Sequence, residues 1–148
     1  MSSLSAVLGN KGEKIEFEHG GKTWKVSYLT QAKKAAFEQW LKQQAMRAVF
    51  AAREFVAPDE YAEALREVSR DAASGTYYFH GEVARRALGT PAGSIALAAV
   101  LFGCPEEEMA GLVAARGDDV RAVMDAVVAE SNAREGGRPN PEAGAAKG

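Results

Sequence analysis

The fold of this chain is decided by residues 14–28, which read Lys-Ile-Glu-Phe-Glu-His-Gly-Gly-Lys-Thr-Trp-Lys-Val-Ser-Tyr. Apolar and polar residues alternate on both sides of the central glycine pair, which is the period of a β-strand with one buried face. A Gly-Gly loop favours a tight hairpin turn because both residues can adopt positive φ. With that loop Phe17 pairs with Trp24 and Ile15 with Val26, so the apolar side chains share one face. A two-stranded ribbon is marginal alone, and we therefore predict that this face packs on another element.

The element expected to cover the hairpin is a long helix over residues 31–55, which contain no glycine or proline. Thr30 directly before it is a suitable N-cap. Apolar residues recur there at steps of three and four, as one stripe of a helix requires. The stripe consists of Phe37, Trp40, Leu41, Ala45, Ala48, Ala52 and Phe55.

Proline and glycine divide the rest of the chain into short helices. These are expected at residues 58–73, 76–88, 90–102, 105–116 and 118–131. Residues 1–13 and the Gly/Pro-rich residues 132–148 are predicted to be flexible ends of a single globular domain, 14–131. The predicted fold class is α+β and predominantly helical, with a β-hairpin packed on a long helix and then a compact bundle of short helices.

Length and composition indicate an ordinary soluble protein. The 148 residues are 47% hydrophobic and 26% charged, which suits one globular domain. The net charge of −2 does not favour a protein that coats nucleic acid. No basic leader is present, and the longest apolar run, residues 95–102, is far shorter than the roughly 20 residues of a membrane span. We therefore expect a cytoplasmic protein with no membrane association.

Charge is unevenly distributed along the chain. Residues 1–56 carry a net charge of +4 and residues 57–131 a net charge of −7. Complementarity within one molecule, or chance, explains this difference most simply. The alternative is that the two halves meet different partners, or neighbouring copies of the same chain.

Catalytic and metal-binding patterns are weak. Cys104, the lone cysteine, would need a histidine as base to act as a nucleophile, and nothing in the sequence brings His19 or His80 to it. Two histidines also make a poor basis for a metal site. The acidic clusters begin helices, where the helix dipole already favours them. We therefore predict no enzymatic activity, no metal and no cofactor.

Residues 83–95 have a pattern similar to a helix-turn-helix, which would indicate DNA binding. Its second helix continues as an apolar run without a side chain that could hydrogen-bond to base edges. The surrounding chain is acidic, which repels phosphate. A nucleic-acid partner is therefore not favoured.

Aromatic residues supply the candidate partner interface. Tyr77, Tyr78 and Phe79 are consecutive, so they cannot all face one side of a helix. Trp40 and Phe50 add apolar surface to the long helix, and Phe50 lies off its stripe. Core packing is the simpler interpretation of the triplet. The functional alternative is that these five residues contact a protein partner or another copy.

The order of these elements resembles the tail assembly chaperones of long-tailed bacteriophages. The resemblance lies in the hairpin FEHGGKTWKVSYLT, the long helix after it, and the stretches CPEEEMAGLVAARG and DDVRAVMDAVVAESN before a Gly/Pro-rich end. It covers residues 14–132 as a layout, without an invariant motif. The chain departs from the family pattern at Gly103-Cys104-Pro105, where relatives often have His-Pro.

This resemblance implies a non-enzymatic protein of the host cytoplasm that binds the hydrophobic tape-measure protein and recruits tail-tube subunits, with possible self-association. The alternative is a structural virion component, such as a head–tail connector or tail-completion protein. A small DNA-binding regulator is a weaker third hypothesis.

Overall fold

The hairpin forms in the predicted register. The computed structural model describes residues 15–26 and 28–137, with only the backbone over 134–137. Strands β1 (Ile15–His19) and β2 (Lys22–Val26) are antiparallel and place Phe17 opposite Trp24. Both glycines of the loop have positive φ, 59° and 78°, as the sequence required.

The chain divides into two compact units. The first contains the hairpin and the chain from Leu101 onward, and the second is Gln31–Val100. Helix α2 (Gln31–Ala51), the element predicted to cover the hairpin, is assigned to the second unit.

In the first unit, three aromatic rings form the centre of the core. Phe102 lies edge-on to Phe17 at 5.4 Å and to Trp24 at 6.3 Å between ring centroids. The hairpin is also tied to helix α6 (Glu106–Gly137) by Arg116, whose guanidinium lies 4.6 Å from the Phe17 ring centre. Residues far apart in sequence thus supply the apolar cover that a two-stranded ribbon needs.

Arg116 also marks a break in α6. Its backbone is not helical (φ −143°, ψ 46°), which confirms the expected division between two helical segments at this point. Its side chain donates hydrogen bonds to the Glu18 carbonyl oxygen and, at 3.0 Å, to Asp119. The prediction that the flexible tail begins at residue 132 is wrong, because α6 continues to Gly137. The rest of the tail and residues 1–13 lie outside the described residues.

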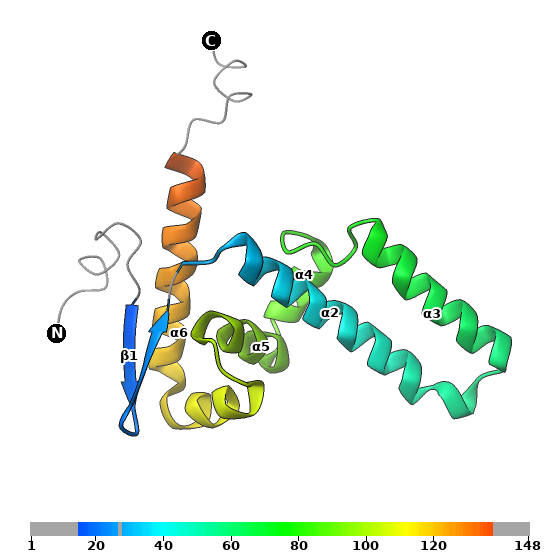
Figure 1. Cartoon of the computed structure of the whole chain (residues 1–148), viewed down its shortest axis with the longest axis horizontal. Coiled ribbons are helices and arrows are strands. Elements are labelled where there is room, and N and C mark those ends of the chain that lie inside the picture. Colours follow the sequence, from blue (N-terminus) through cyan, green and yellow to red (C-terminus); the bar gives the residue numbers. More distant parts are fainter. Residues whose placement is uncertain (1–14, 27, 138–148) are drawn as a thin grey trace, which may run out of the picture. The chain divides into compact units, whose positions relative to one another are not determined.

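The second unit is built on a pair of neighbouring helices. Helix α2 packs against α3 (Pro58–Ala73) and α4 (Glu82–Leu88), and Figure 1 shows α2 and α3 side by side. The bounds of α3 agree with the prediction, and Gly75 ends the segment with a φ of +85°. Helix α5 (Pro91–Phe102) also has its predicted extent, and Thr90 caps it by accepting a hydrogen bond from the Gly93 N–H at 3.1 Å.

Two predicted helices of this unit are too long. The helix over 31–55 ends at Ala51 and is followed by a separate 3-10 helix, η1 (Arg53–Phe55). The helix over 76–88 starts only at Glu82, because residues 76–81 form turns closed by hydrogen bonds from the Tyr78 N–H to the Gly75 carbonyl and from the Gly81 N–H to the Tyr78 carbonyl.

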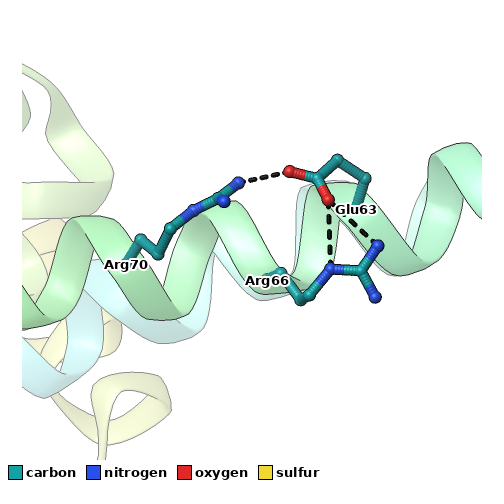
Figure 2. Close-up of polar contacts among 3 residues, drawn as sticks. All are labelled: Glu63, Arg66 and Arg70. Carbon is teal, nitrogen blue, oxygen red and sulfur yellow. Dashed lines mark hydrogen bonds and ion pairs between the residues drawn. The ribbon is translucent and has the colours of Figure 1, made fainter.

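The outer face of α3 is polar. Glu63 forms ion pairs with Arg66, at 2.9 Å, and with Arg70, as Figure 2 shows. The hydrogen bond from Arg70, followed by that from Arg66, holds the pKa of Glu63 below its usual range. Because these side chains are largely exposed, the pairs stabilise the surface helix only weakly.

Candidate protein-binding surface

Phe37 of α2 is the centre of an aromatic cluster that contains two of the predicted interface residues. The fully buried Phe37 ring stacks on Trp40, at 5.5 Å between centroids, and meets the edge of Phe79 at 5.8 Å. Trp40 and Phe79 are each half-buried. Most of the surface of these two rings therefore contributes to packing inside the second unit.

The turn over residues 76–81 is fastened to α2 by polar contacts. The Phe79 N–H donates a 2.7 Å hydrogen bond to the Glu38 carboxylate. The buried Lys34 places its Nζ atom 3.3 Å from His80 Nε2 and 5.8 Å from the centre of the Phe79 ring. These contacts explain why the aromatic triplet is held in a turn rather than continuing a helix.

The three residues of the triplet have different surroundings. Tyr78 is 57% exposed, and its ring meets the edge of His80 at 5.5 Å. Tyr77 is half-buried, and burial, followed by the charges of Asp71 and Glu67, raises the pKa of its hydroxyl. Of the triplet, Tyr78 is thus the residue most exposed to solvent.

Trp40 also contains a buried polar atom. Its Nε1 atom is shielded from solvent and has no hydrogen-bond partner among the described residues. An unsatisfied buried donor costs about 1–3 kcal/mol. Trp40 therefore contributes to stability through its ring and not through its N–H.

A second exposed apolar surface lies where α2 gives way to α3. It consists of Phe50, Phe55 and Val56, which are 50%, 84% and 37% exposed, and we call it the apolar tip. Figure 1 shows the end of α2 and the start of α3 together at one end of the helical pair. Three large apolar side chains within seven residues of chain thus face solvent at one turn.

Backbone hydrogen bonds build the tip without a glycine. The Ala52 N–H is shared between two carbonyls of α2, those of Ala48 and Val49, and the Phe55 N–H donates to the Ala52 carbonyl at 2.9 Å. Val56 is extended (φ −127°, ψ 159°), which leads the chain out of η1 and toward α3. The backbone around Phe55 is therefore hydrogen-bonded, and this ordered backbone holds the Phe55 side chain in its exposed position.

Proline and a cation–π contact complete the tip. Pro58 occupies the first turn of α3, where its missing N–H costs nothing. The Arg53 guanidinium lies 5.6 Å from the centre of the Tyr61 ring, which ties η1 to α3.

The predicted stripe of α2 therefore does not extend to Phe55. Phe37 and Leu41 are buried, whereas Ala48 is exposed and Phe55 is the most exposed of the large apolar residues described. The reason is geometric: a 3-10 helix turns about 120° per residue instead of about 100°, so a residue beyond the junction leaves the stripe. Pro58 gave no warning of this, since the residue that it keeps out of helical φ and ψ is Ala57, which lies beyond Phe55.

Cys104 carries the one thiol of the chain and is half-buried. Burial, followed by the charge of Glu108, raises the pKa of the Cys104 thiol, against the opposing effect of Lys22. A higher pKa lowers the fraction of reactive thiolate. Among residues 15–26 and 28–137, no group of three or more histidine, cysteine or acidic side chains is placed to hold a metal ion. In the same part of the chain no helix is both long and apolar enough to cross a bilayer.

No protein-family model matches the chain, and comparisons with curated proteins and with solved structures find no similar protein. Function is therefore inferred from the exposed surface and from the order of the elements along the chain.

Proposed function

We propose that this protein is a non-enzymatic assembly chaperone that covers apolar helical surface on another protein. Within that class we propose a phage tail assembly chaperone acting on the tape-measure protein, as the resemblance in layout implies. The observation that carries the proposal is the apolar tip, where Phe55 is 84% exposed. Exposed aromatic side chains such as Phe55 are typical anchors of protein–protein contacts.

A helical client suits the exposed side chains. Phenylalanine and tyrosine are typical anchors of protein interfaces because they bury a large area with few rotatable bonds. A long helical protein with apolar surface would aggregate before assembly unless that surface is covered. Phe55 at the tip, the most exposed of the large apolar side chains described, supplies such an anchor.

Co-expression tests the proposal. The tape-measure protein would be produced with and without this chain, and its soluble fraction and light scattering would be measured. We expect the tape-measure protein to be soluble only in the presence of this chain, and assembled particles to lack it. Equal solubility in both cases would contradict a chaperone. Stoichiometric presence in mature particles would instead support a structural virion component.

A further inference from the structure

We infer that the apolar tip is the client-binding surface and that its ligand is an amphipathic helix whose apolar stripe is flanked by lysine or arginine. The inference rests on the proposed function and adds to it the place of contact and the chemistry of the client segment. Two properties of the tip carry it: the form of its apolar surface and the charges around that surface.

The apolar surface of the tip suits a concave seat on a partner. Phenylalanine offers about 200 Å² of side-chain area, so the exposed parts of Phe50 and Phe55 amount to about 270 Å². A stable dimer buries about 800 Å² on each partner, so two such tips facing one another fall well short. A single projecting ring is better covered by a hole between the side chains of a client helix, as in knobs-into-holes packing.

The charged groups around the tip favour a basic client. Five exposed charged residues lie over residues 47–60, and three of them are carboxylates: Arg47, Arg53, Glu54, Asp59 and Glu60. Arg53 lies over the Tyr61 ring and keeps its charge, so these five residues carry a net charge of −1. The carboxylates are therefore the larger set of charges available to a client, and lysine or arginine beside the apolar stripe would complement them.

The test uses three synthetic helical peptides with one leucine stripe and flanking lysine, glutamine or glutamate. Their affinities for the full-length protein would be measured by fluorescence anisotropy at low and high salt. We expect the lysine peptide to bind at least about threefold more tightly than the glutamine peptide, and the glutamate peptide to bind most weakly. High salt should reduce these differences, because exposed charges are screened within about 8 Å at physiological ionic strength.

Two sets of variants separate the apolar and the charged contributions. Phe55→Ser should weaken binding of all three peptides about tenfold, since an exposed anchor is removed. Asp59→Asn with Glu60→Gln should abolish the preference for lysine and leave the glutamine peptide unaffected. Tyr78→Ser, which removes an exposed aromatic ring outside the tip, is the matched control and should bind all three peptides like the wild type. Helical content by circular dichroism would show that each variant is folded.

The outcomes distinguish this inference from the proposed function. If the wild type binds the peptides but Phe55→Ser binds them equally well, or if the glutamate peptide binds best, the inference is wrong. It is also wrong if the wild type solubilises the tape-measure protein but binds no peptide, or if Tyr78→Ser weakens binding and Phe55→Ser does not. Failure of the wild type in both assays would contradict the proposed function itself.

Discussion

Single residues decide where backbones can approach one another in this protein. Gly93, near the start of α5, is the clearest case: a Cβ atom there would lie 1.9 Å from the Ala87 carbonyl oxygen. Gly111 in α6 differs, because a Cβ atom there would meet nothing within 4 Å. A side chain is therefore excluded at Gly93 and has free space at Gly111.

Gly93→Ala should lower the free energy of unfolding by about 1–3 kcal/mol, because the backbone at Ala87 must move to admit a methyl group. Gly111→Ala should raise the free energy of unfolding by about 0.5–1 kcal/mol, because alanine is the better helix former. Urea denaturation of both variants checks this pair. Equal effects of the two substitutions would show that the α5 backbone at Gly93 does not lie so close to the Ala87 carbonyl.

Ser131 is a second decisive residue. Its buried hydroxyl accepts a hydrogen bond from the Leu29 N–H and donates one to the Val127 carbonyl, each at 2.8 Å. Ser131→Ala leaves the Leu29 N–H without its acceptor and should lower the free energy of unfolding by about 1–3 kcal/mol. Asn132→Ala, at an exposed neighbour, should have little effect in the same denaturation experiment. A loss no larger than that of the control would show that water replaces the hydroxyl.

At the scale of elements, the hairpin depends on Arg116 of α6. Arg116→Met keeps the apolar stem but removes the hydrogen bonds to the Glu18 carbonyl and Asp119 and the cation–π contact with Phe17. We expect this substitution to lower the free energy of unfolding by only about 1 kcal/mol, because the Arg116 side chain is partly exposed. Amide hydrogen exchange should rise in β1 and β2. Arg121→Met, at an exposed residue with no ion pair to the described residues, should leave exchange in the hairpin unchanged.

The polar face of α3 predicts a pH dependence. The pKa of Glu63 is lowered in the folded protein, so its stabilising effect is present above the unfolded-state pKa and is lost as pH falls through the folded-state pKa. Thermal unfolding should therefore show Glu63→Gln below the wild type in Tm near pH 7, with the difference vanishing once the pH falls below the folded-state pKa of Glu63. Glu67→Gln, on the same helix without an ion pair to the described residues, should show a smaller pH-dependent difference. A difference for Glu63→Gln that persists in acid would contradict the prediction.

The elements with regular patterns were predictable from sequence. The hairpin register follows from strict alternation around Gly20 and Gly21, and the bounds of α3 and α5 follow from Pro58 and Pro91 at their starts. These signals are local, because positive φ and the missing proline N–H act on the residues beside them.

The predictions from sequence were wrong where contacts between distant residues override the local backbone preference. Residues 76–81 have no glycine or proline before Gly81, yet the Glu38 carboxylate binds the Phe79 N–H and holds a turn there. Nothing in the spacing of the sequence indicates that pairing across 41 residues. Likewise, Phe55 matched the stripe of α2, and only the 3-10 geometry of η1 turned it outward.

At the scale of the whole molecule, the central claim is that this protein acts through exposed apolar side chains at the apolar tip. Site-specific photo-crosslinking tests it most directly, with a photoreactive residue in place of Phe55 and, as the control, in place of Arg66 on the polar face of α3. In cells that co-express the tape-measure protein, we predict a crosslink from position 55 and none from position 66. Crosslinking from position 66 alone, or from neither position while the tape-measure protein is kept soluble, would contradict the account.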